Sequence, residues 1–158
     1  MKMLKKLAAL ILAATMALVL FTACGGDTTS TPEAQAEAQM MSTINAKRGS
    51  AVQLCNDTEL KQEAEKFLDS AVDINTGFLK FTNSVKVDRD DQGIYTAKIV
   101  VKNEYTGKLL EEFFKMVNSQ NKDVNINAVG KWTKVGVAAK TIKGNMYISI
   151  VVQVNPNA

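Results

Sequence analysis

The sequence contains no histidine among its 158 residues, and this absence restricts the possible chemistry more than any other feature. A serine or cysteine nucleophile usually needs a neighbouring base, most often histidine, to become reactive. Zinc sites take their ligands from histidine, cysteine and carboxylates. A Gly-rich phosphate loop after a strand is also missing. The sequence therefore predicts a protein that is not an enzyme and that has no catalytic residues, no metal and no cofactor.

Long apolar runs are scarce too, and the one that exists is at the N-terminus. The basic start MKMLKK precedes LAALILAATMALVLF, a run of 15 residues. A membrane-spanning helix needs about 20 apolar residues, so this run is typical of a signal peptide. It leads to LFTAC, in which Ala23 directly precedes Cys24.

The LFTAC stretch resembles the lipobox of bacterial lipoproteins. In that family the cysteine thiol receives a diacylglyceryl group, and the cysteine becomes the mature N-terminus. The resemblance implies a signal peptide at residues 1–23, lipidation of Cys24 with palmitate-type chains, and a position at the extracytoplasmic face of the cell membrane. Two acyl chains are enough for stable anchoring. The alternatives are a signal peptide that ends near a cysteine by chance and an uncleaved signal anchor.

Cysteine is almost as rare as histidine, since the chain has only Cys24 and Cys55. If Cys24 carries lipid, Cys55 has no intramolecular partner. Cys55 lies in AVQLCND, just before a predicted helix, and no histidine is present to generate its thiolate. We interpret it as a small, half-buried structural residue.

The mature chain has no excess charge of either sign. Three of the nineteen basic residues, Lys2, Lys5 and Lys6, lie in the predicted signal peptide, which leaves sixteen basic and sixteen acidic residues. Nucleic-acid binding requires a clustered basic face, and the charges here alternate in sign, as in ELKQEAEK. We therefore exclude nucleic acid as a partner.

The rest of the chain divides into a tether and one domain. Residues 24–39 are small and polar, with little to bury, which predicts a flexible tether whose Ala/Gln/Glu half could be helical. Residues 40–158 have the size of one domain. Periodicity predicts helices at 38–48, 56–72 and 107–119, strands at 93–103, 132–142 and 146–154, and a turn at 143–145. We expect Trp132, at the start of a strand, to be a core residue.

These elements carry a set of motifs in a fixed order. They are INAKR at 44–48, Leu60 with Ala64, MVNSQNKDVNIN at 116–127, VGVAA at 135–139, and GNMYISIVVQV at 144–154. The set resembles the CAP superfamily of cysteine-rich secretory, antigen 5 and pathogenesis-related proteins, in its shorter bacterial form. The resemblance implies an α+β fold in which helices flank a small antiparallel sheet as an α-β-α sandwich.

The departures from the family pattern concern its cleft. Better-studied members line that cleft with two histidines and two acidic residues that can hold a divalent cation. Here Lys122 stands at the motif histidine and Met116 at the motif tryptophan, and no acidic motif precedes the third helix. The acidic DRDDQG at 88–93 lacks the spacing of a calcium loop, so we interpret it as a turn.

Two functions remain open. The first is a cell-surface lipoprotein with a degenerate, non-catalytic CAP-like domain that binds a small hydrophobic ligand or an envelope protein. Its residual cleft would include Asn45, Arg48, Ser119 and Lys122, although helix capping and a solvated loop would also explain these residues. The second is an accessory envelope lipoprotein of unrelated α+β fold, acting as a subunit or inhibitor-like partner. Helices on both faces of the sheet would favour the first, and a bare face would favour the second.

Overall fold

The structure is a computed structural model that describes residues 31–48, 52–80, 84–105, 111, 115 and 131–157. The predicted signal peptide and Cys24 lie outside the described residues. The elements in chain order are α2 (Pro32–Arg48), α3 (Thr58–Ala71), β1 (Val85–Arg89), β2 (Tyr95–Lys102), the 3-10 turn η2 (Asn103–Tyr105), β3 (Trp132–Ile142) and β4 (Asn145–Val154). The described part is therefore of the α+β class, as predicted.

The strands form one antiparallel sheet in the order β1-β2-β4-β3. β3 and β4 are joined by the turn predicted from KGN, where Lys143 and Gly144 have φ values of 51° and 77°. β2 then pairs with the other side of β4, from Tyr95↔Val154 to Lys102↔Tyr147. This register places β4 in the middle of the sheet, which explains its nearly continuous apolar sequence.

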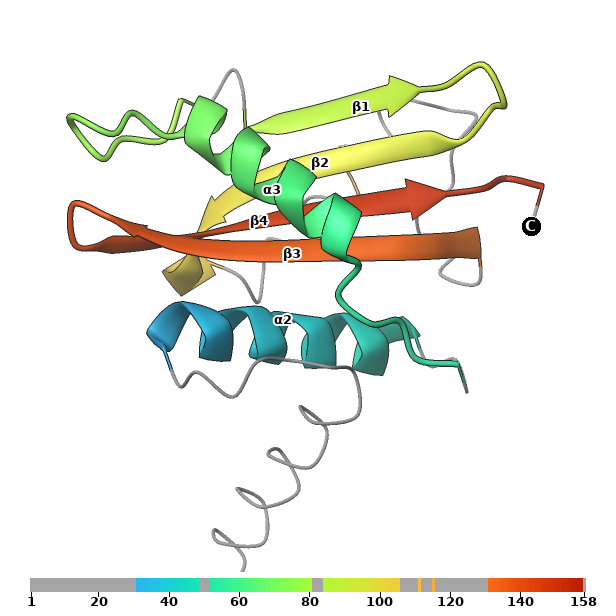
Figure 1. Ribbon diagram of the computed structural model, residues 1–158, viewed down its shortest axis with the longest axis horizontal. Helices are drawn as coiled ribbons and strands as arrows, with labels where there is room; N and C mark the ends of the chain where they lie inside the picture. The colour runs from blue at the N-terminus through green and yellow to red at the C-terminus, as the bar shows by residue number, and fades with distance from the viewer. Residues whose placement is uncertain are drawn as a thin grey trace, which may run out of the picture. The chain divides into compact units, whose positions relative to one another are not determined.

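The side chains of α2 and α3 pack on opposite faces of this sheet. In Figure 1, α3 crosses in front of the strands and α2 runs alongside β3. Side chains alternate between the two faces along a strand. On β4, Ile148 and Ile150 belong to the cluster that contains Met40 and Ile44 of α2. The next residue, Val151, points to the other face and packs with Leu60 and Ala64 of α3. Trp132 is buried in the α2 cluster, which confirms its assignment to the core.

Close packing of α3 depends on Gly136 of β3. A side-chain carbon at this position would lie 2.2 Å from the backbone carbonyl carbon of Leu60 and 2.4 Å from the backbone nitrogen of Lys61. The first turn of α3 therefore rests directly on the strand backbone. Its N-cap is Asp57, whose carboxylate accepts hydrogen bonds from the amides of Glu59 and Leu60.

The outer edge of β3 is covered by side chains instead of another strand. The Asn56 amide donates to the carbonyl of Val137 at 2.9 Å and accepts from its N–H at 2.8 Å. Two residues further along β3, the N–H of Ala139 donates to the carboxylate of Glu37 on α2. Glu37 also pairs with Lys61 of α3 at 2.6 Å. An edge that is satisfied in this way is protected from pairing with other chains.

α2 begins before the predicted helix at 38–48 and extends into the predicted tether. Residues 32–39 are helical, and Ala36 is buried. The hydroxyl of Thr31 accepts from the amide of Ala34, and Pro32 occupies the first turn, where its missing N–H costs nothing. The Ala/Gln/Glu half of the predicted tether is therefore part of α2.

β1 was not predicted. Its sequence VKVDR alternates, but it is only five residues long and lies directly before an acidic turn. It pairs antiparallel with β2 over its whole length, from Val85↔Ile99 to Arg89↔Tyr95. β2, β3, β4 and α3 are confirmed. Of the predicted third helix at 107–119 the structure describes only Glu111 and Lys115, both helical.

Candidate functional site

Asn45 and Arg48, the first two residues of the predicted cleft, form hydrogen bonds to the chain that follows α2. The amide of Asn45 donates to the carbonyl of Leu54 and accepts from its N–H, both at 2.9 Å. The guanidinium of Arg48 donates to the carbonyl of Val52 at 3.0 Å and lies 3.5 Å from the Asn45 carbonyl oxygen. These bonds tie the connection between α2 and α3 to the end of α2. Asn45 and Arg48 therefore have structural contacts, and their place in a ligand cleft stays a prediction.

The second half of the predicted cleft cannot be placed beside the first. Ser119 and Lys122 lie outside the described residues, as does Met116. A cleft that joins Asn45 and Arg48 to Ser119 and Lys122 stays a prediction.

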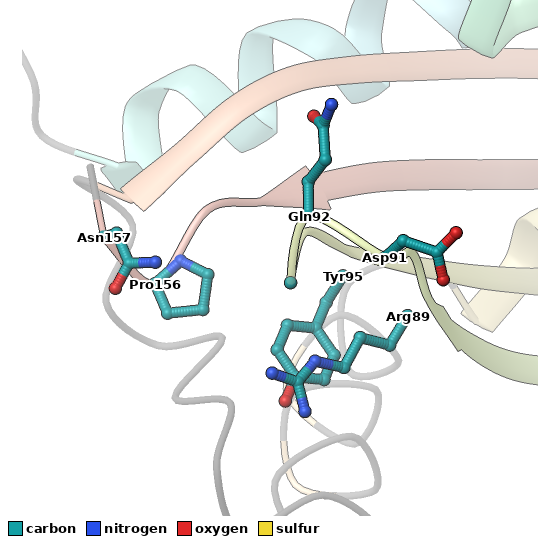
Figure 2. Close-up of a pocket in the computed structure, with 7 residues that line it drawn as sticks. Arg89, Asp91, Gln92, Tyr95, Pro156 and Asn157 are labelled. Carbon is teal, nitrogen blue, oxygen red and sulfur yellow. The ribbon is translucent and has the colours of Figure 1, made fainter.

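A hollow of about 330 Å³ lies at the opposite end of the sheet from the β3–β4 turn. It was not predicted from the sequence. Figure 2 shows the Arg89 side chain alongside the ring of Tyr95, with Pro156 and Asn157 across from them. Its walls come from the β1–β2 hairpin and from the C-terminal tail after β4. The lining residues are Arg89, Asp91, Gln92, Gly93, Tyr95, Pro156 and Asn157.

Arg89 is the chemically distinctive group of this hollow. Its guanidinium carbon lies 5.2 Å from the centre of the Tyr95 ring, a cation–π contact. Within the described ranges, no carboxylate or carbonyl accepts a hydrogen bond from it. An arginine presents five N–H donors in a fixed plane, which suits a carboxylate or another planar anion. The hollow can therefore bind an acidic group.

Both walls of the hollow are held by local hydrogen bonds. The Asp90 carboxylate accepts from the amides of Gln92 and Ile94 at 2.9 and 2.8 Å. On the tail, the amide of Asn155 donates to the carbonyl of Lys131 at 3.0 Å. The side chain of Lys131 donates to the carbonyl of Pro156. DRDDQG is thus a hairpin turn, as predicted.

A cluster of charged side chains joins β1, β2 and α3 on the face of the sheet that α3 covers. The ammonium of Lys98 on β2 lies 2.6 Å from the Glu63 carboxylate of α3 and 3.0 Å from the Asp88 carboxylate of β1. Burial opposes the ionised form of Asp88, but the ammonium groups of Lys86 and Lys98 outweigh it and lower the pKa of Asp88. Burial likewise lowers the pKa of Lys98, and its two carboxylates more than offset this and raise it. The cluster is structural, since each charge is paired.

Cys55 differs from the expectation in two ways. It is exposed instead of half-buried, and it is disulfide-bonded instead of free. Its partner lies outside the described residues. A lipidated Cys24 would have no thiol for a disulfide, so lipidation of Cys24 and an intramolecular disulfide at Cys55 exclude each other.

The described residues were also considered as ligands for a metal ion. No group of three or more cysteine, aspartate or glutamate side chains there could hold a metal ion. The expectation of a metal-free protein remains a prediction, because the stretch that resembles the CAP motif is not described.

Comparisons with known proteins do not assign the chain to a family. No protein-family model, curated protein or solved structure matches the chain. Among the described helices, none is both long and apolar enough to cross a membrane.

Proposed function

We propose that this chain is a non-enzymatic lipoprotein that is anchored through Cys24 at the extracytoplasmic face of the membrane and carries a degenerate CAP-like domain for binding. The observation that carries the CAP-like part is the packing of α2 and α3 on opposite faces of one antiparallel sheet. The alternative, an unrelated accessory fold, would be favoured by a sheet with one face left bare. The anchor part is supported by the lipobox-like LFTAC stretch.

The binding partner that the described surface favours is an acidic segment of an envelope protein. The hollow beside Arg89 is open and polar, which suits a charged group better than a small hydrophobic ligand. Arginine and tyrosine are also the side chains that most often dominate protein–protein binding energy. Tyr95 is itself almost fully buried, so it fixes the position of Arg89 from below.

The anchor predicts a clear outcome for Cys24→Ala. The wild-type chain, expressed in a bacterium, should fractionate with membranes, and its mature N-terminal peptide should carry diacylglycerol on Cys24. The Cys24→Ala chain should be released or remain unprocessed, because it has no thiol to accept lipid. Mass spectrometry of the N-terminal peptide makes the measurement. An unmodified mature N-terminus that begins at another residue would refute the anchor.

The same sample resolves the state of Cys55. Lipidation of Cys24 leaves Cys55 as an exposed thiol, which should react with maleimide without prior reduction. A Cys55 that reacts only after reduction would show that a disulfide persists in the mature protein.

The binding part predicts that a partner depends on Arg89. Cross-linking in intact cells, followed by purification of the lipidated protein, should recover a specific envelope protein. Arg89→Ala should reduce that recovery about tenfold or more, because loss of a charged hydrogen bond at an interface costs about 1.5–3 kcal/mol. The exposed Lys66 on α3 provides the matched control, since Lys66→Ala also removes one surface cation. Equal recovery with Arg89→Ala and Lys66→Ala would exclude the hollow as the contact.

A further inference from the structure

Three segments that are distant in sequence meet at the end of the sheet where the β3–β4 turn lies. Figure 1 shows the start of α2, the β3–β4 turn and the loop after α3 at this end. The carboxylate of Glu33 accepts a 2.5 Å hydrogen bond from the hydroxyl of Thr141, which holds the start of α2 beside the turn. A side-chain carbon built on Gly77 would lie 2.9 Å from Cβ of Lys143, so the loop after α3 touches the same turn. We call this region the tether end.

The loop at residues 73–79 is a firmly held structure. The carboxylate of Asp73 accepts hydrogen bonds from the amides of Asn75 and Thr76 at 2.8 and 3.1 Å. The hydrogen bonds from the amides of Thr76 and then Asn75 lower the pKa of Asp73. The Tyr147 hydroxyl of β4 donates to the carbonyl of Gly77 at 2.5 Å and attaches the loop to the middle of the sheet.

This rigid loop directs two large apolar side chains into solvent. Ile74 is 63% exposed and Phe78 is 75% exposed. A flexible loop could turn such side chains inward, but the bonds on either side of Ile74 and Phe78 hold the backbone in place. Exposed Lys80 follows Phe78 by two residues, and exposed Lys143 lies against Gly77 of the same loop. An apolar pair with neighbouring lysines is the composition of a segment that lies at a lipid–water interface.

We propose that Ile74 and Phe78 insert into the lipid surface and orient the anchored domain with its tether end on the membrane. This inference rests on the proposed anchor at Cys24. Thr31, the residue before α2, is seven residues beyond Cys24 in the sequence. A chain of seven residues spans at most about 25 Å. The lipid would therefore hold the tether end, and with it Ile74 and Phe78, close to the membrane.

A membrane suits this patch better than a protein partner. A stable protein interface buries roughly 800 Å² on each side, and two side chains separated by polar Asn75 and Thr76 do not supply that area. The lipid anchor supplies most of the binding, and it raises the effective concentration of the loop at the surface. Two side chains are then enough to select one orientation.

Tryptophan reporters test this orientation. The only tryptophan, Trp132, is 4% exposed and lies at the far end of β3 from the turn, so it provides an internal baseline. We would purify the lipidated full chain as Phe78→Trp and reconstitute it in phosphatidylethanolamine–phosphatidylglycerol vesicles with brominated acyl chains. Val52→Trp is the matched control, since Val52 is 70% exposed but follows the far end of α2.

Brominated lipids should quench about half of the emission added by Phe78→Trp, since interfacial segments reach about 5–10 Å into the boundary between headgroups and acyl chains. The Val52→Trp and wild-type chains should show little quenching. Equal quenching of the two reporters, or none in a chain that mass spectrometry shows to be lipidated, would overturn the orientation and leave the anchor intact. A reporter that is shielded from acrylamide in native membranes but not quenched in vesicles would overturn it in favour of a protein partner. An unlipidated N-terminus would overturn both proposals.

Discussion

Gly136→Ala is expected to lower the free energy of unfolding by about 3 kcal/mol, or to prevent folding altogether, because it overpacks a rigid contact. The added carbon would lie 2.2 and 2.4 Å from two backbone atoms of α3, in Leu60 and Lys61. A flexible side chain could move aside, but these atoms move only if the helix shifts. The shift would also disturb Ala64, which belongs to the same helix and is completely buried. Urea unfolding of the two chains measures the difference.

Gly144→Ala is the matched control for this prediction. Gly144 lies in the β3–β4 turn with φ of 77°, and no atom is within 4 Å of the position where a side-chain carbon would be. Alanine there should cost only about 1 kcal/mol, from the left-handed backbone conformation. Gly136 itself does not have a positive φ, so its replacement carries no such backbone cost. If both variants lose the same stability, the close approach of α3 to Gly136 adds nothing and is not a rigid contact.

Asn56→Ala is expected to lower the free energy of unfolding by about 2–3 kcal/mol. The change removes two hydrogen bonds to Val137 and leaves an N–H and a carbonyl of the edge strand without partners in a partly buried position. It also uncovers the edge of β3, so the variant should self-associate as its concentration rises. Urea unfolding and light scattering at several concentrations measure the two effects.

Asn155→Ala provides the comparison for Asn56→Ala. Asn155 makes one exposed side-chain hydrogen bond, to the amide of Asn157 in the C-terminal tail, so its loss should cost well under 1 kcal/mol. Comparable losses in both variants, with no self-association of Asn56→Ala, would contradict the assignment of Asn56 as the cover of the β3 edge.

Much of the fold can be predicted from local sequence because neighbouring residues carry the signal. α3 has a good N-cap in Asp57 and an apolar residue at every turn, from Leu60 to Ala71. β4 is a continuous apolar run that follows a glycine turn. In each case the preference arises from backbone geometry and from contacts within a few residues. Thr31 followed by Pro32 is also a helix-start signal. The first turns of α2 contain few apolar residues, however, so periodicity did not indicate a helix there.

The hydrogen-bond partners of the polar side chains could not be predicted from local sequence. Asn56 looked like a helix cap, yet it bonds to a strand residue 81 positions away, while Asp57 caps the helix. Glu37 looked like part of a solvated tether, yet it bonds to a strand residue 102 positions away. A side-chain hydrogen bond carries no periodic pattern, so its partner appears only when the chain brings the two groups together.

The same distinction between local sequence and tertiary structure applies to the candidate sites. Cys24 can be proposed from a short stretch of sequence, because a signal peptide and its processing site are recognised as a linear segment. The hollow at Arg89 and the apolar pair Ile74 and Phe78 belong to no linear motif. Each is formed by segments that are distant in sequence, the β1–β2 hairpin with the C-terminal tail in one case and the α3 loop with the β3–β4 turn in the other. Antiparallel pairing across the sheet brings these segments together, and it depends on burial summed over the whole domain, which no short window of sequence contains.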